Sequence, residues 1–120
     1  MPNEAQDDLD LERPYGQWWQ VDGAMVRVSP SALRRFGVAA MRHAGATEDD
    51  AQFVVEVYVE KSMQGDHTRG LENLPPLLRA ALKGKVDLHP SIKVLKESPG
   101  TALLDGGRSA LNVLVCRAAM

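Results

Sequence analysis

Three glycines divide most of this sequence into stretches of helical length. Gly45, Gly65 and Gly84 each follow a run in which apolar residues recur three or four positions apart, the spacing of one face of an α-helix. Glycine readily ends a helix because it adopts the left-handed backbone conformation without steric cost. A chain punctuated in this way is predicted to form three consecutive helices joined by short connections.

The predicted helix starts are equally well marked. Ser29-Pro30 supplies a cap followed by proline at the first helical position. Thr47 caps the second helix, and Asp50 occupies the capping-box position. Pro75-Pro76 is tolerated only in a first turn, so the regular part of the third helix is expected to begin near Leu74. The faces expected to be apolar are Leu33, Phe36, Ala40 and Ala44 in the first helix and Ala51, Val54, Val55, Tyr58 and Ser62 in the second.

The pattern changes after Gly84. Residues 91–96 and 101–104 are short strand candidates, with Ser98-Pro99-Gly100 as the turn between them. Residues 110–120 are again helical, and Leu111, Leu114, Val115 and Ala118 share one face. The sequence therefore predicts a mixed α/β fold: a unit of about three helices, a β-hairpin and a terminal helix.

The N-terminal region has a different composition. Residues 1–24 are predicted to form a flexible acidic and aromatic arm, and residues 25–120 a single domain that starts with a short strand at 25–28. The arm holds an adjacent tryptophan pair, Trp18-Trp19. These rings either cap the core of this chain or dock onto a second chain, because each offers a large apolar area.

Charge and composition exclude several classes of protein. The 14 basic and 16 acidic residues form no basic run, which argues against a nucleic-acid partner. No apolar stretch approaches the roughly 20 residues that span a bilayer. The single cysteine, Cys116, is interpreted as a small buried apolar residue. One cysteine cannot form an internal disulfide, and a cytoplasmic location is expected.

One segment has the composition of a reactive site. Asp66-His67-Thr68-Arg69 lies between Gly65 and Gly70. Histidine moves protons near neutral pH, and arginine binds a carboxylate through two parallel hydrogen bonds. Polar residues between two helices are also a common solvated connection, so both interpretations stay open. No histidine, cysteine or carboxylate spacing typical of a metal site is present, and no metal is expected.

The order of these features resembles a known family. The capped start Thr47-Glu48-Asp49-Asp50-Ala51, the glycine-bounded polar segment, Leu74-Pro75 and Asp105-Gly106 together resemble the N-terminal part of the type-2 malate/L-lactate dehydrogenases. That family includes ureidoglycolate dehydrogenases, sulfolactate dehydrogenases and Δ1-piperideine-2-carboxylate reductases. The resemblance covers residues 26–120. It implies a fold that is not Rossmann, NAD or NADP as cofactor, a 2-oxo acid, 2-hydroxy acid or cyclic imine as substrate, and a homodimer or larger assembly.

The reactive motif departs from the family pattern. The family usually carries Gly-His-x-Ser/Thr-His-Gly, and Gly65, Thr68 and Gly70 fit it. The resemblance places the catalytic histidine at Arg69 and the carboxylate-binding arginine at Asn73. Arginine stays protonated and cannot shuttle a proton. His67 is a neighbouring imidazole, but one position away its side chain is expected to point in another direction. The implied catalytic residues are thus Thr68, Arg69 and His67, and the implied substrate-binding residues are Asn73 and Arg69.

Three functions are compatible with this sequence. The first is a truncated or split member of the NAD(P)-dependent family, not catalytic alone and not expected to bind NAD or NADP tightly by itself. The second is a non-catalytic module that pairs with a full-length relative or another partner, as a homo-oligomer or hetero-oligomer. The third is an enzyme with altered chemistry, in which Arg69 holds an anionic substrate and His67 or Asp66 handles the proton.

Overall fold

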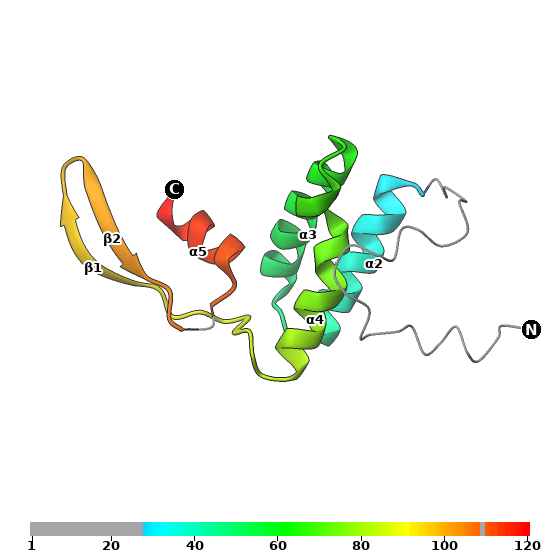
Figure 1. Cartoon of the computed structure of the whole chain (residues 1–120). Coiled ribbons are helices and arrows are strands. Elements are labelled where there is room, and N and C mark those ends of the chain that lie inside the picture. Colours follow the sequence, from blue (N-terminus) through cyan, green and yellow to red (C-terminus); the bar gives the residue numbers. More distant parts are fainter. Residues whose placement is uncertain (1–27, 109) are drawn as a thin grey trace, which may run out of the picture.

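A computed structural model describes residues 28–108 and 110–120 of the chain. The predicted arm, Trp18-Trp19 and most of the predicted strand at 25–28 lie outside the described residues. The elements in chain order are α2 (Pro30–His43), α3 (Glu48–Met63), the 3-10 turns η2 (His67–Arg69) and η3 (Leu71–Asn73), α4 (Leu74–Leu82), β1 (Lys93–Ser98), β2 (Thr101–Asp105) and α5 (Asn112–Ala119). The predicted α/β class is confirmed (Figure 1).

The helix boundaries follow the local signals. Gly45, Gly65 and Gly84 follow α2, α3 and α4 with positive φ angles of 107°, 80° and 69°. The Thr47 hydroxyl accepts a hydrogen bond of 3.2 Å from the Asp50 backbone N–H, as predicted for a cap. The Asp50 carboxylate, however, binds Arg117. The helix α4 begins at Leu74, so Pro75-Pro76 lies in its first turn.

The core lies between α3 and its neighbours α2 and α4. Its largest fully buried side chains are Met41, Val54, Val55, Val59 and Leu74. Gly37 allows α2 to lie close to α3, because a Cβ atom there would be 2.8 Å from Val55 Cγ1. Two sequence expectations are wrong: Phe36 is 66% exposed, and Cys116 is exposed. Both side chains lie on helix faces that no described element covers.

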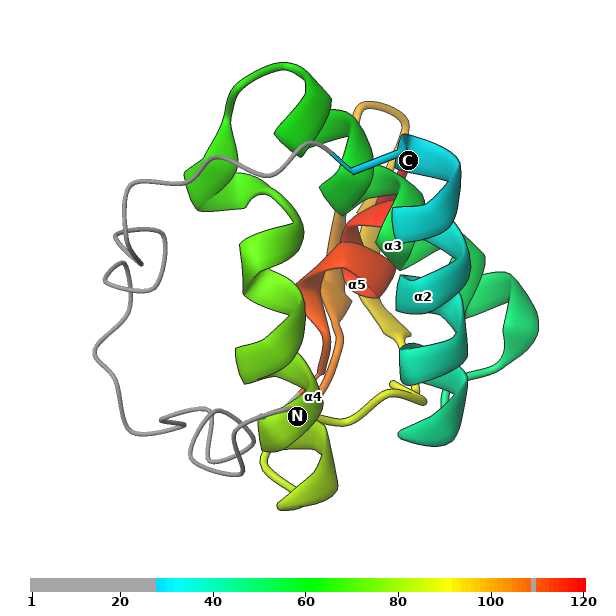
Figure 2. The same cartoon turned by 90° about the vertical axis from the view of Figure 1, so that its right-hand side faces the viewer.

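The strands β1 and β2 form an antiparallel hairpin, as predicted. Lys93 pairs with Asp105, and Ser98 pairs with Thr101. A bulge between Val94 and Lys96 leaves Leu95 without a partner in the register. The hairpin extends away from α2, α3 and α4, with α5 between it and those helices (Figure 1). Figure 2 views the molecule from the helical side, with the hairpin behind.

The last helix closes the end of the core. The Leu111 N–H donates to the Asp87 carbonyl oxygen at 3.2 Å, beside a parallel bridge between Asp87 and Ala110. Leu111 and Leu114 are 4% and 5% exposed, so the predicted apolar face of this helix is confirmed at those two positions. In the described part of the chain, no helix combines the length and hydropathy needed to cross a lipid bilayer.

Candidate functional site

The polar segment, residues 65–73, connects α3 to α4 through two consecutive 3-10 turns. The first turn is closed by the Gly70 N–H, which donates to the His67 carbonyl oxygen at 3.0 Å. The second is closed by the Asn73 N–H, which donates to the Gly70 carbonyl oxygen, also at 3.0 Å. These hydrogen bonds fix the backbone of the segment. The Cα–Cβ directions of the side chains in its first turn are therefore fixed as well.

One close contact anchors this segment to α3. The Leu71 N–H donates to the Ser62 hydroxyl oxygen at 2.8 Å. Gly70 is buried, and a Cβ atom at that position would lie 2.2 Å from Ser62 Oγ. Any side chain at position 70 would displace the segment from Ser62, so the anchor requires glycine. Ser62 was expected on the apolar face of its helix, and its role as an acceptor was missed.

The side chains of the first turn face water. His67, Thr68 and Arg69 are exposed, and the Arg69 side chain is 77% exposed. Asp66 lies close to two of them: its carboxylate accepts a 3.2 Å hydrogen bond from the Thr68 hydroxyl and lies 3.6 Å from Arg69 Nη1. The structure thus brings two of the predicted site residues, Thr68 and Arg69, to the carboxylate of Asp66. An ion pair this exposed contributes little to stability and leaves the guanidinium accessible to an anion.

Asn73 points back into the polar segment. Its Nδ2 atom donates to the carbonyl oxygens of Thr68 and Gly70, each at 3.0 Å. The amide therefore braces the two turns from within. Nothing in the described structure tests whether Asn73 binds a substrate, and that role stays a prediction.

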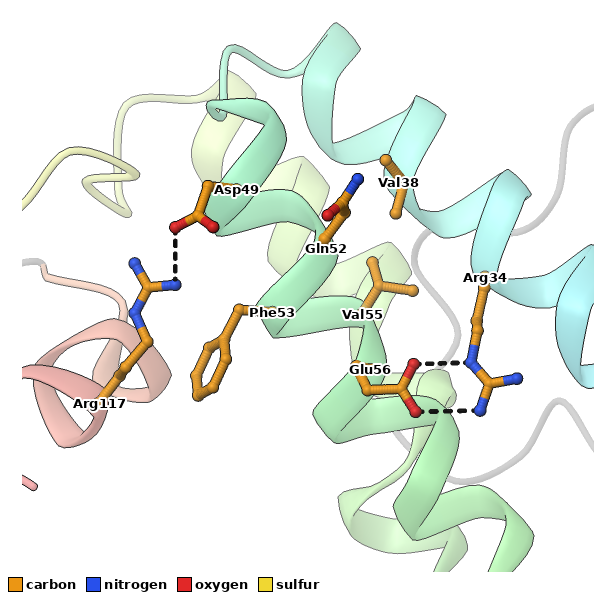
Figure 3. Close-up of a pocket in the computed structure, with 8 residues that line it drawn as sticks. All are labelled: Arg34, Val38, Asp49, Gln52, Phe53, Val55, Glu56 and Arg117. Carbon is orange, nitrogen blue, oxygen red and sulfur yellow. Dashed lines mark hydrogen bonds and ion pairs between the residues drawn. The ribbon is translucent and has the colours of Figure 1, made fainter.

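A separate hollow of about 520 Å³ lies along α2 and α3 beside α5 (Figure 3). It is lined by Arg34, Val38, Asp49, Gln52, Phe53, Val55, Glu56 and Arg117. Arg34 donates two hydrogen bonds to Glu56: Nε to Oε2 at 2.6 Å and Nη2 to Oε1 at 2.9 Å. These bonds from Arg34 lower the pKa of Glu56 and raise the pKa of Arg34.

Arg117 joins α5 to α3 on the other side of the hollow. Its Nη1 atom lies 3.2 Å from Asp49 Oδ2, and its Nη2 atom contacts Asp50 Oδ1. The guanidinium carbon lies 4.7 Å from the centre of the Phe53 ring, within range of a cation–π interaction. The charges of this hollow are thus paired across elements, which favours a structural clamp over a ligand site. Sequence reasoning missed both pairs because their partners are far apart in the chain.

Elsewhere in the described part of the chain, the histidines and acidic residues form no further centre. His89 Nε2 lies 2.7 Å from the Gly45 carbonyl oxygen and ties a loop to the end of α2. Among the described residues, no group of three or more histidine, cysteine or acidic side chains is arranged to hold a metal ion. The polar segment is therefore the candidate site.

Comparison with known proteins identifies the family. The profile of the malate/L-lactate dehydrogenase family matches residues 28–120. A malate dehydrogenase from Pyrococcus abyssi is 34% identical over 86 residues, which are 72% of this chain and 24% of that protein. An L-sulfolactate dehydrogenase from Methanocaldococcus jannaschii is 29% identical over 79 residues, 66% of this chain and 23% of that protein.

A solved structure agrees with the sequence matches. The malate dehydrogenase from Pyrococcus horikoshii superposes with a TM-score of 0.75 at 32% identity, covering 82% of this chain and 28% of that one. This chain spans about a quarter of the length of the relatives that it matches. The family match extends over both the helices and the hairpin. The chain belongs to the malate/L-lactate dehydrogenase family and corresponds to its N-terminal region.

Proposed function

We propose that this chain is the N-terminal unit of an NAD(P)-dependent oxidoreductase for 2-hydroxy acids, 2-oxo acids or cyclic imines, and that it does not catalyse the reaction alone. One observation carries the proposal. At the position to which the resemblance assigns the catalytic histidine, the chain has Arg69, with an exposed guanidinium beside Asp66. A guanidinium binds a carboxylate well, but it cannot accept and release a proton near neutral pH.

The polar segment suggests a division of roles. Arg69 would hold the carboxylate of a small 2-oxo or 2-hydroxy acid, because carboxylate and guanidinium form paired hydrogen bonds. His67, exposed in the same turn, is the imidazole available for proton transfer. Thr68 donates to Asp66 and would limit the positions that this carboxylate can take. Asn73 would act through the backbone that it braces.

The glycine turn that follows β2 does not fit the phosphates of a dinucleotide. Gly107 is the described position that most resembles a phosphate-binding turn, but its N–H donates to Asp105 Oδ1 at 2.9 Å. A carboxylate at that place repels a phosphate. Neighbouring Gly106 is packed against Val115, since a Cβ atom there would lie 2.6 Å from Val115 Cγ2. We therefore assign the binding of the nicotinamide cofactor, NAD or NADP, to other polypeptide.

A second function is favoured by the changes at Arg69 and Asn73 taken together. Both altered positions are the reactive ones in the resemblance, whereas the Thr47 cap and the Ser62 anchor of the polar segment are both formed in this chain. A chain that has the fold of its relatives but a different residue at the implied reactive positions suits a non-catalytic module. Such a module would assemble with a full-length relative or with a second copy of itself, in the cytoplasm.

One experiment separates the two functions. The complementary part of the Pyrococcus horikoshii malate dehydrogenase, without its own matched region, is mixed with this chain, and NADH consumption is followed with a 2-oxo acid. The double variant Arg69→His with Asn73→Arg is expected to raise turnover by about 10²-fold or more, the usual contribution of a positioned acid–base group. The matched control is Arg35→His, which changes an exposed arginine on α2 outside the segment.

The outcomes have distinct meanings. Turnover by the unaltered chain without added polypeptide would overturn the proposal that it is inactive alone. A stable complex in which the double variant gives no turnover would reject the site assignment and favour the assembly module. A rise with Arg35→His as large as with the double variant would show that position 69 has no special role.

A further inference from the structure

We propose that the acidic and aromatic N-terminal segment, residues 1–24, docks onto a basic groove between α2 and α3 of the same chain. The groove is formed by described residues, whereas the segment lies outside them and is known by its sequence. This inference goes beyond the function proposed above, because the polar segment at 65–73 takes no part in it. It also concerns residues that the family match, at 28–120, does not include.

The groove consists of two adjoining hollows. The first is the hollow of about 520 Å³ described above, and the second has a volume of about 390 Å³. Both are lined by Arg34, Val38 and Gln52, which Figure 3 shows on the facing sides of α2 and α3. The second hollow is completed by Arg35, Ala39, Arg42 and Glu48. A continuous groove thus follows α2 from Arg34 to Arg42.

The α2 side of the groove is positively charged. Three arginines and one glutamate line the second hollow, and Pro30–His43 contains no acidic residue. Arg42 Nη1 lies 2.8 Å from Glu48 Oε2, but these side chains are 60% and 50% exposed. Arg35 is exposed, and none of the ion pairs among the described residues includes it. Because a guanidinium has five N–H donors, Arg35 and Arg42 can bind further carboxylates.

The N-terminal segment has the complementary composition. Residues 1–24 contain one basic residue, Arg13, and six acidic ones: Glu4, Asp7, Asp8, Asp10, Glu12 and Asp22. The same segment holds the tryptophan pair, Trp18-Trp19. Carboxylates form charged hydrogen bonds with guanidinium groups, and indole rings pack on arginine and on apolar side chains such as Val38. A groove with arginines above small apolar residues therefore suits this segment.

The segment can reach the groove without leaving its own chain. Arg42 lies twelve residues after Pro30, which is about 18 Å along the helix axis. An extended segment that runs back along α2 advances about 3.3 Å per residue, so roughly six residues cover this length. Trp18 and Trp19 precede Pro30 by twelve and eleven residues, and most of the acidic residues by more. A tethered segment has an effective concentration on the order of 1 mM, which favours it over the segment of a second copy.

Tryptophan fluorescence tests the proposal, because Trp18 and Trp19 are the two tryptophans of the chain. In the folded full chain, acrylamide is expected to quench this fluorescence less strongly than in the urea-unfolded chain. The double variant Arg35→Glu with Arg42→Glu should lower the equilibrium constant for docking about tenfold and increase the quenching. The control Lys83→Glu with Lys85→Glu makes the same change of charge at two exposed lysines outside the groove, and it should leave the quenching unchanged.

A charge exchange separates docking from a loss of stability. Asp7→Arg with Asp8→Arg changes no described residue, so it should leave the helices intact and yet increase the quenching. Combined with Arg35→Glu and Arg42→Glu, it should restore the protection of the tryptophans.

Three results would overturn the proposal. One is quenching in the folded chain that equals quenching in urea. Another is protection that persists in both the groove variant and the Asp7→Arg with Asp8→Arg variant. The third is protection that disappears on dilution, which would place the segment on a second copy.

Discussion

Replacing Gly70 with alanine tests the anchor that holds the polar segment on α3. The new Cβ atom would lie 2.2 Å from Ser62 Oγ and 3.2 Å from both Ser62 Cα and Cβ. The shorter distance is far inside van der Waals contact, so either the serine or the segment must move. Serine cannot rotate away without releasing the Leu71 N–H, to which its oxygen is bonded at 2.8 Å.

The expected cost follows from these two effects. Overpacking in a tightly packed region costs about 1–3 kcal/mol, and loss of the Leu71 hydrogen bond adds about 1 kcal/mol. Gly70→Ala should thus lower the free energy of unfolding by about 2–4 kcal/mol, unless the segment detaches first. Backbone strain adds nothing, because Gly70 has φ −90° and ψ −158°, which alanine adopts freely.

Urea denaturation followed by circular dichroism measures this effect, and hydrogen exchange at the Leu71 amide detects local release. The control is Gly100→Ala, since a Cβ atom at Gly100 would meet nothing within 4 Å. The variant Ser62→Ala removes the clashing oxygen, so the double variant Ser62→Ala with Gly70→Ala should cost less than the sum of the two single changes. A Gly70→Ala protein as stable as the Gly100→Ala control, with unchanged exchange at Leu71, would refute the reasoning.

Three further predictions concern the rest of the described structure. The lowered pKa of Glu56 means that its pairing with Arg34 stabilises the fold at pH values above the unfolded value near 4.5, and that this contribution is lost as the pH falls through the folded pKa. Arg34→Gln should therefore raise the midpoint of the Glu56 carboxyl titration toward 4.5, as followed by NMR; an unchanged midpoint would contradict the assigned cause. Arg117→Ala should lower the free energy of local opening of α5 by about 1–2 kcal/mol, measured as faster amide exchange in Asn112–Ala119. Unchanged exchange would show that Leu111 and Leu114 suffice to hold this helix. Cys116, the single cysteine, should react with a thiol reagent in the folded protein at close to the rate of the urea-unfolded chain, and strong protection in the folded state would contradict its exposure.

Predictions from the sequence held where the deciding contacts are local. A helix cap such as Thr47 acts on an N–H three residues away, and a glycine ends a helix through its own φ angle. The family resemblance likewise rested on short motifs in a fixed order, and the matches to known dehydrogenases confirm it. The hairpin was predicted from its turn, although β1 begins and ends two residues later than expected.

Predictions failed where partners are distant in the chain. Arg34 and Glu56 are 22 positions apart, and Arg117 and Asp50 are 67 apart, so no local pattern signals either pair. Phe36 and Cys116 fit apolar patterns, yet both are exposed, because burial depends on which neighbouring element covers a helix face. For the candidate site, the sequence located Asp66, Thr68 and Arg69 but could not orient them.

The sequence by itself thus determined the helices, the hairpin and the family, because each depends on neighbouring residues or on the order of short motifs along the chain. Only the tertiary structure decided how the polar segment is held. The contact of Gly70 with Ser62, and the two hydrogen bonds from the Asn73 amide, arise when α3 and the 3-10 turns come together. Such contacts depend on how separate elements pack against one another, so their distances are set only when the chain has folded.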